Sequence, residues 1–418
     1  MPDARKSLSL SDDCSAKDVL ELKQFLEEQG TFHFPSLPNG LFSAGTSDGA
    51  DFGLTGYRNV WVRDNIHIAH AHSEWGETDQ AVAATKSLMA FYIKHKHRFT
   101  DIIDGRTDSS DPMNRPHIRF DGNRLNELSE KWSHAQNDAL GAFLWLTAKL
   151  ADRCRWQNDE LELLDHVATF LQAIQFWKDE DSGHWEEVRK VAASSIGVAT
   201  AGLEAWGTRF DSSLKKFGRK SLESILPSEC VQSEAGKRRR YDSALLFLIY
   251  PYRVVSDEMA DRIVSDVTTH LMGEYGIRRY LGDSYWCADY KEKLSADVRT
   301  ADFSDDLTTR DRLLEPGLEA QWCLFDPIVS IHYGLRFERT HDPKDRSRQI
   351  RHLNRSLSQL TSLDSCFGAY RCPESYYSER GRYVPNDICP LLWTQANLKL
   401  AIIHLIRSLN QNHLPVFV

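Results

Sequence analysis

The chain has 418 residues, of which 41% are hydrophobic, and its 51 Lys and Arg against 60 Asp and Glu give a formal net charge of −9 at pH 7. This acidic balance provides no general basic surface for nucleic acid, so we expect no nucleic-acid partner. No stretch of about 18 apolar residues occurs, and Met1–Ser11 is polar, so we expect neither a membrane span nor a signal peptide.

Helical patterns follow one another along nearly the whole chain. Residues 1–16 are expected to form a flexible N-terminus before a helix at 17–29, and residues 31–59 predict irregular structure or short strands. Apolar periodicity then predicts helices, in chain order, at 65–75, 78–97, 135–153, 158–178, 187–208, 210–224, 241–250, 256–273, 317–337, 343–361 and 389–409. No Gly/Ser-rich, Pro-rich or single-charge linker separates them, so one domain over residues 1–418 is predicted.

Apolar and charged helices alternate in this series. Those near residues 135, 187, 241, 317 and 389 are apolar or rich in small residues, whereas 158–178 and 343–361 carry more charge. Inner and outer helices of a closed double ring differ in this way, so we expect an all-α ring of about twelve helices. Polar clusters stand just before the inner helices and are expected to meet at one end of the ring.

Two adjacent glutamates, Glu186 and Glu187, follow Trp185 and precede an apolar run that predicts a buried helix. Carboxylates beside a buried helix are costly unless they are paired or used. Neighbouring residues of a helix point about 100° apart, so one glutamate can face a substrate as acid or base while the other hydrogen-bonds beside it. The alternative is that both glutamates only favour the helix dipole.

Other polar residues allow two interpretations. Arg63 and Asp64 form either an ion pair at a helix start or a set of charge-assisted donors and acceptors for vicinal hydroxyls. Trp132 is either a core residue or a wall open to a polar site, because Ser133 and further polar residues follow it. Asp138 and Asp242 each begin an apolar run, which predicts helix capping.

Histidines and cysteines suggest no metal site. His67 and His70 share a helix face and His72 follows, but no further ligands stand nearby, and zinc commonly needs three or four ligands. The eight cysteines are scattered and form no CxxC, which predicts free thiols in a reducing, cytoplasmic compartment.

Taken together, the clusters resemble glycoside hydrolase family 15, the glucoamylase-like enzymes, and the related domain of phosphorylase kinase regulatory subunits. The matching stretches span about residues 57–400 and are Trp61-Val-Arg63-Asp64, Trp132 to Gly141, Trp185-Glu186-Glu187, Arg279-Tyr280 with Asp283 and Tyr285, and Glu374 followed by Pro390-Leu-Leu-Trp393-Thr-Gln-Ala396. The resemblance implies an (α/α)6 barrel with the active site at one end. It also implies hydrolysis of α-glucosidic bonds from a non-reducing end, with inversion and without a cofactor or metal.

Carried over residue by residue, the resemblance implies that Glu186 is the general acid and Glu374 the general base. The implied substrate contacts are Trp61, Arg63, Asp64, Trp132, Trp185, Glu187, Arg279 and Trp393. An inverting enzyme holds its two carboxyl groups about 6.5–9.5 Å apart. Trp185 and the charge of Glu187 are both expected to raise the pKa of Glu186.

The expected partner is an α-glucan or glucooligosaccharide, and the alternative is a non-catalytic carbohydrate-sensing domain like that of the kinase subunits. Linkage preference, chain-length preference and oligomeric state stay open.

Overall fold

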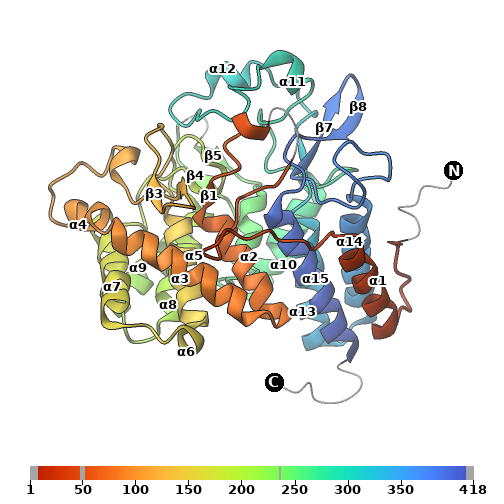
Figure 1. Cartoon of the computed structure of the whole chain (residues 1–418), viewed down its shortest axis with the longest axis horizontal. Coiled ribbons are helices and arrows are strands. Elements are labelled where there is room, and N and C mark those ends of the chain that lie inside the picture. Colours follow the sequence, from red (N-terminus) through yellow and green to blue (C-terminus); the bar gives the residue numbers. More distant parts are fainter. Residues whose placement is uncertain (1–7, 48–51, 235–236, 411–418) are drawn as a thin grey trace.

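Six helical elements form a closed inner ring. They are α2 (Val62–Trp75), α5 (Asn137–Lys149), α8 (Ala193–Ala205), the 3-10 helix η5 (Ser243–Leu248), α13 (Asp326–Thr340) and α15 (Leu392–Asn410). Each element contacts the next in this order, and α15 contacts α2, which closes the ring. The computed structural model describes residues 8–47, 52–234 and 237–410 (Figure 1).

A second helix packs against each member of the inner ring. The pairs are α3 (Thr78–Lys94) with α2, α7 (Asn158–Ala173) with α5, α9 (Ser212–Ile225) with α8, α10 (Asp257–His270) with η5, α14 (Pro343–Ser358) with α13, and α1 (Ala16–Glu28) with α15. The first helix of the chain thus pairs with the last. This arrangement confirms the predicted (α/α)6 barrel.

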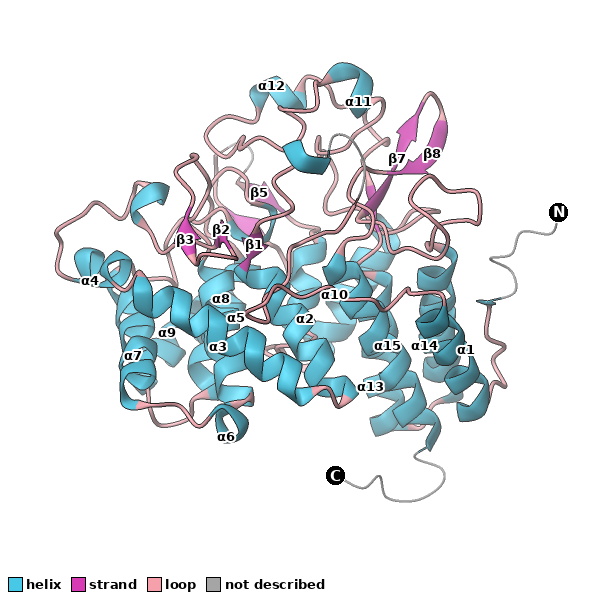
Figure 2. Cartoon of the chain, in the orientation of Figure 1, coloured by secondary structure: helices cyan, strands magenta, loops and turns pink. Residues whose placement is uncertain are grey.

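Short elements fill the connections between the helices. The helical ones are α4 (His97–Ile103), α6 (Ala151–Cys154), α11 (Tyr290–Lys293), α12 (Thr308–Asp311), η2 (Phe52–Leu54), η3 (Pro112–Asn114) and η4 (Gly183–Trp185). Three antiparallel sheets comprise β1 (Val60–Trp61), β2 (Arg119–Asp121) and β3 (Asn126–Glu127); β4 (Cys230–Val231) and β5 (Arg238–Arg239); and β6 (Gln321–Trp322), β7 (Ser375–Glu379) and β8 (Arg382–Pro385). In Figure 2 these strands gather at one end of the helical barrel.

Strand pairing sets the positions of several side chains at this end. In β1 and β2, Trp61 is paired with Arg119. In β6 and β7, Trp322 is paired with Ser375, the residue that follows Glu374. The small sheets therefore bring segments that lie far apart in the sequence to one rim of the barrel.

Close contact between α5 and α8 depends on glycine. A Cβ atom added at Gly202 would lie 2.2 Å from the carbonyl oxygen of Gly141. A Cβ atom at Gly141 would lie 2.4 Å from the Cα of Ala199. The two inner helices can approach this closely only because neither glycine carries a side chain.

Three predicted helices differ from the observed ones. The helix predicted at 187–208 begins only at Ala193, because the preceding residues form a loop in which Lys190 is bridged to Asp181. The segment 241–250 forms the 3-10 helix η5 instead of an α-helix. The helix predicted at 317–337 begins at Asp326, because Gln321 and Trp322 pair with β7 as a strand. In each case tertiary contacts override the local helical pattern.

The predicted flexible N-terminus falls partly on residues 1–7, which lie outside the described residues. From residue 8 onward the chain is attached to the barrel. Leu8 is buried, and Leu10 donates its N–H to Asn354 of α14 at 2.8 Å and accepts from the same amide at 2.7 Å. Residues 8 and 10 of the N-terminus predicted as flexible thus contact the barrel. None of the described helices is long and apolar enough to cross a membrane.

Candidate active site

One pocket opens at the end of the barrel where the inner helices begin. Nine of the ten predicted site residues line it, namely Trp61, Arg63, Asp64, Trp132, Trp185, Glu186, Arg279, Glu374 and Trp393. They come from the loops before α2, α5, α8, α13 and α15 and from the first turns of α2 and α15. The ring thus brings the separate polar clusters together, as the alternation of helices predicted.

Glu186 occupies a tight loop before α8, and its backbone lies in the left-handed region at φ 57°. A non-glycine residue seldom adopts this conformation, so the surrounding contacts must hold it there. Its Oε1 accepts from the Trp61 indole at 3.0 Å, from the Gln136 amide at 3.1 Å and from Arg63 at 3.5 Å. These three donors fix one carboxyl oxygen and leave the other for a partner in the pocket.

Burial raises the pKa of Glu186, and the neighbouring Arg63 and Gln136 act in the opposite direction. Glu187 was also expected to raise the pKa of Glu186. It is not among the groups that shift this pKa most, and its own charge is balanced by Arg279, Arg310 and Arg239.

Glu374 is held by two donors. Its Oε1 accepts the Tyr57 hydroxyl at 2.6 Å, and its Oε2 accepts the Asn386 amide at 2.5 Å. The Tyr57 oxygen also lies 3.2 Å from that of Tyr285. Burial raises the pKa of Glu374 to about 7, although both donors act to lower it.

A chain of contacts connects the two carboxyl groups along one wall of the pocket. Trp61 binds Glu186, its ring lies 5.3 Å from that of Tyr57, and Tyr57 binds Glu374. The pKa values of Glu186 and Glu374 are both raised, so the direction of the shift does not distinguish the acid from the base. The assignment of Glu186 as acid and Glu374 as base stays a prediction.

Arg63 and Asp64 do not pair with each other through a hydrogen bond among the described contacts. Arg63 donates to Asp138 at 2.7 Å and to the His184 carbonyl at 3.0 Å, and its Nε has no partner among the described residues. Burial raises the pKa of Asp64 to about 7. The pocket therefore contains an unpaired N–H and a carboxyl group, which are the groups that hydroxyls require.

The two aspartates predicted as helix caps differ. Asp138 lies in the first turn of α5, where Gln136 holds the N-cap position, and it is paired with Arg63 and lies 3.5 Å from His184. Asp242 accepts the N–H of Ala244 at 2.8 Å and caps η5, as predicted, and it also accepts the Trp185 indole at 2.9 Å.

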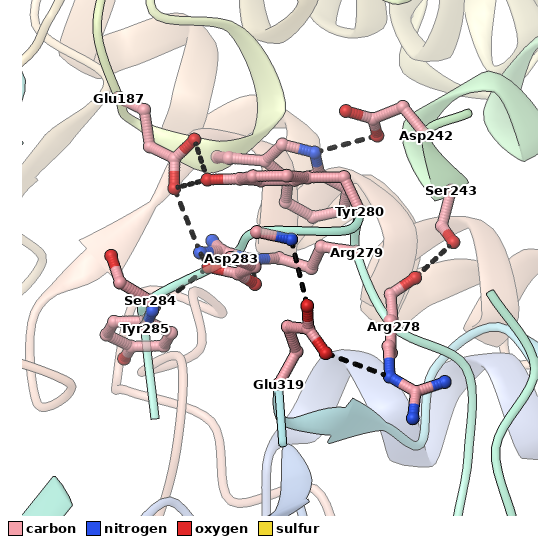
Figure 3. Close-up of polar contacts among 12 residues, drawn as sticks. Glu187, Asp242, Ser243, Arg278, Arg279, Tyr280, Asp283, Ser284, Tyr285 and Glu319 are labelled. Carbon is pink, nitrogen blue, oxygen red and sulfur yellow. Dashed lines mark hydrogen bonds and ion pairs between the residues drawn. The ribbon is translucent and has the colours of Figure 1, made fainter. Parts of the chain in front are cut away.

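Glu187 lies behind the pocket wall and does not line the pocket. Its side chain accepts from Arg279 at 3.0 Å and from the Tyr280 hydroxyl at 2.7 Å (Figure 3). It also accepts from Arg310 at 2.9 Å. Burial acts to raise the pKa of Glu187, but Arg279, Arg310 and Arg239 outweigh it and lower the pKa to about 2. Glu187, predicted as a substrate contact, therefore binds the pocket residue Arg279 and does not itself line the pocket. Arg279 is itself held by Asp283 through two bonds of 2.6 Å.

Several pocket residues were missed from the sequence. They are the lining residues Tyr57, Tyr285, Arg310 and Trp322, together with Gln136 and Asn386, which donate to Glu186 and Glu374. Tyr57, Gln136 and Tyr285 stand inside or next to the polar clusters, so their positions offered a signal. Arg310 and Asn386 had none, because no local pattern indicates their contacts with Glu187 and Glu374.

The three clustered histidines have other partners. His67 stacks on Trp393 at 4.6 Å between ring centroids, His70 lies 3.0 Å from the Tyr250 hydroxyl, and His72 lies 2.5 Å from Glu77. Within the part of the chain that the structure describes, no group of three or more His, Cys, Asp or Glu is placed to hold a metal ion.

Curated relatives and solved structures resemble this chain over different lengths. The probable phosphorylase b kinase regulatory subunit alpha of Caenorhabditis elegans is 24% identical over 264 residues, which cover 54% of this chain and 21% of that protein. The chain thus spans about a fifth of the length of the curated relatives it matches.

Among solved structures, a wild-type glycosidase has a TM-score of 0.64 at 17% identity and covers 93% of this chain and 97% of its own. A bacterial glucoamylase complexed with acarbose has a TM-score of 0.57 at 14% identity, covering 88% of this chain and 53% of its own. At these identities the likeness shows the fold, and both structures share the helical barrel. The family profile "Glycosyl hydrolases family 15" matches residues 33–384, so the chain belongs to this family.

Proposed function

We propose that the protein is an inverting, exo-acting α-glucosidase of the glucoamylase type, which releases glucose from the non-reducing ends of α-linked glucooligosaccharides. The observation that carries the proposal is that Glu186 and Glu374 line the same pocket, each with its carboxyl group held by named donors. Family membership supports the same class of reaction.

In the proposed reaction, protonated Glu186 gives its proton to the glycosidic oxygen as the bond between that oxygen and the anomeric carbon breaks. Ionised Glu374 removes a proton from water, whose oxygen attacks the anomeric carbon from the opposite face. A new carbon–oxygen bond replaces the old one, so the first glucose formed is the β-anomer. The reaction ends with Glu186 ionised and Glu374 protonated, and proton exchange with water restores both.

The remaining pocket residues suit the binding of one sugar ring. Arg63 and Asp64 line the pocket and offer charged groups for hydroxyls, and Trp61, Trp132 and Trp393 provide aromatic walls.

A second candidate is a carbohydrate-sensing domain without turnover, which the matches to kinase regulatory subunits favour. Both candidates would bind a glucan or glucooligosaccharide, and they differ in whether glucose is released. All eight cysteines are free, which agrees with the proposed reducing, cytoplasmic location.

Glucose release from maltose, isomaltose and longer α-glucans tests the proposal, together with NMR of the first anomer formed. We expect the β-anomer and a loss of turnover of at least about a thousandfold in Glu186→Gln, because the amide cannot donate the required proton. Glu162→Gln, at an exposed position outside the pocket, is the matched control and should retain full activity. Sugar binding without glucose release by the wild type between pH 4 and 8 would favour the sensing domain, and an α-anomer would exclude inversion.

A further inference from the structure

A segment outside the predicted site closes one side of the pocket. We name residues 299–311 the roof; it includes α12, which lies beyond the strands at the active-site end of the barrel in Figure 1. Five roof residues line the pocket, namely Thr300, Ala301, Asp302, Phe303 and Arg310. The roof is therefore part of the candidate active site and not only a connection between helices.

The roof is fastened to the floor of the site through Arg310. This buried side chain donates to Glu187 at 2.9 Å and to the Ser284 hydroxyl at 3.0 Å. The Ser284 hydroxyl in turn donates to Asp311 at 2.6 Å. Because Glu187 also binds Arg279, the roof and the predicted substrate contact Arg279 share one carboxylate.

Two further attachments lie on opposite sides of the pocket. Towards the hairpin of β7 and β8, Asp387 is paired with Lys291 at 2.7 Å and with the roof residue Arg299 at 3.3 Å. Towards the Trp132 wall, the roof residue Asp305 forms an ion pair with Lys131. The roof is therefore attached to the segment that follows Glu374, to the segment that precedes Trp132 and to Glu187.

The roof also presents groups that could bind a second sugar. Asp302 lines the pocket, and its Oδ2 is buried but has no partner among the described residues. The Phe303 ring lies 5.5 Å from the Arg310 guanidinium. An acceptor, a cation and an aromatic ring are together suited to the hydroxyls and the flat face of one sugar residue.

We propose that the roof forms the binding site of the leaving group and restricts the proposed glucosidase to short α-glucosides, with Asp302, Phe303 and Arg310 as specificity-determining residues. The inference rests on the proposed function. An enzyme with an open cleft would gain from each additional sugar that it binds, whereas here the roof accommodates the leaving sugar and excludes a longer chain.

The test compares kcat/KM of purified protein on α-glucosyl fluoride, maltose, isomaltose, maltotriose and maltoheptaose. Glucosyl fluoride has no leaving sugar, so its hydrolysis reports on the catalytic pair alone. We expect kcat/KM to fall at least about tenfold from the preferred disaccharide to the heptasaccharide. Equal or rising values with chain length would overturn the role of the roof while leaving the proposed function intact. No turnover of glucosyl fluoride or of any glucoside would reject the proposed function itself, and the role of the roof with it.

Substitution of Asp302 tests the leaving-group site directly. In Asp302→Ala the fall in kcat/KM on the disaccharide should exceed that on glucosyl fluoride by about tenfold, because one hydrogen bond to the leaving sugar is lost. Asp297→Ala removes an exposed carboxylate that does not line the pocket, and its ratio should match that of the wild type. Equal losses of Asp302→Ala on both substrates would overturn the assignment.

Charge reversal tests the closure. Lys131→Asp places two like charges opposite each other at the ion pair with Asp305, so the ratio of heptasaccharide to disaccharide turnover should rise about threefold. Adding Asp305→Lys restores opposite charges and should return the ratio to the wild-type value. An unchanged ratio in the single variant would show that the roof does not limit chain length.

Discussion

At the scale of single residues, Glu374 depends on two donors for its charge. As the proposed base it must be ionised while Glu186 stays protonated; burial raises the pKa of both, that of Glu374 to about 7, so kcat/KM should be bell-shaped with pH and one limb, near pH 7, should report Glu374. Asn386→Leu removes a hydrogen bond to the carboxylate, so the pKa of Glu374 should rise and the limb near pH 7 should move to higher pH by about one unit. The measurement is the pH profile of kcat/KM on a small glucoside. Asn123→Leu, at an exposed position, is the control, and a uniform loss of activity without movement of the limb would contradict a role of Asn386 in tuning the base.

Two neighbouring glutamates have different surroundings and therefore different roles. Glu186 and Glu187 are adjacent in sequence, yet one lines the pocket and the other is enclosed by arginines. The sequence argument that the two cannot do the same work agrees with this placement, although it assumed a helix where the chain forms a left-handed turn. Burial raises the pKa of the first, and the arginines lower the pKa of the second.

At the scale of helices, the contact between α5 and α8 is a sensitive point of the ring. Gly202→Ala places a methyl group 2.2 Å from the Gly141 carbonyl oxygen, so the helices must separate or distort. We expect the free energy of unfolding to fall by about 3 kcal/mol, measured by urea denaturation. Gly53→Ala is the matched control, because nothing lies within 4 Å of the added methyl group. A stability loss equal in both variants would show that the close approach is not important.

Buried carboxylates also hold the beginnings of inner helices. Asp181 accepts the N–H of Asn137 at the start of α5, and Glu229 accepts both the N–H and the hydroxyl of Ser194 in the first turn of α8. The bonds from the N–H groups of Asn137 and Ser194 satisfy backbone donors that the helix leaves unpaired. Neither carboxylate precedes its helix directly in the sequence, so local capping signals did not reveal them.

At the scale of the whole molecule, buried titratable groups limit stability on both sides of neutrality. Burial raises the pKa of Asp181 and Glu229 to about 8, and that of Asp64 and Glu374 to about 7. Each exceeds its unfolded value near 4, so the stability that these groups contribute at low pH is lost progressively as the pH rises from about 4 through about 7 to 8.

Buried histidines lower the stability of the folded protein at acidic pH. Burial lowers the pKa of His117, His184 and His332 to about 4. Each is below the unfolded value near 6.5, so stability is lost as the pH falls from about 6.5 towards 4.

The histidine arm ends near pH 6.5, whereas the carboxyl arm continues to about pH 8, so Tm should fall between about pH 6.5 and 8, measured by thermal denaturation from pH 4 to 9. Glu229→Gln should flatten the alkaline arm, because the amide does not ionise. A Tm that keeps rising to pH 9, or an alkaline arm unchanged in Glu229→Gln, would contradict this account.

The sequence by itself determined the class of fold and most of the pocket. Apolar periodicity and the alternation of apolar and charged helices are local properties, so the double ring followed from them. The polar clusters recur just before the inner helices, which predicted that they meet at one end; the ten site residues themselves came from the resemblance to glycoside hydrolase family 15, and nine of them line the pocket.

Only the tertiary structure decided which groups became partners and which remained free. Arg63 pairs with Asp138, 75 positions away, while Glu187 is enclosed by Arg279 and Arg310, 92 and 123 positions away. Gln321 and Trp322 form a strand that pairs with β7 in place of the predicted helix. This pairing places Trp322 opposite Ser375, the residue that follows Glu374. Such partners are chosen by packing and charge between distant segments, and a local pattern holds no record of distances across the folded chain.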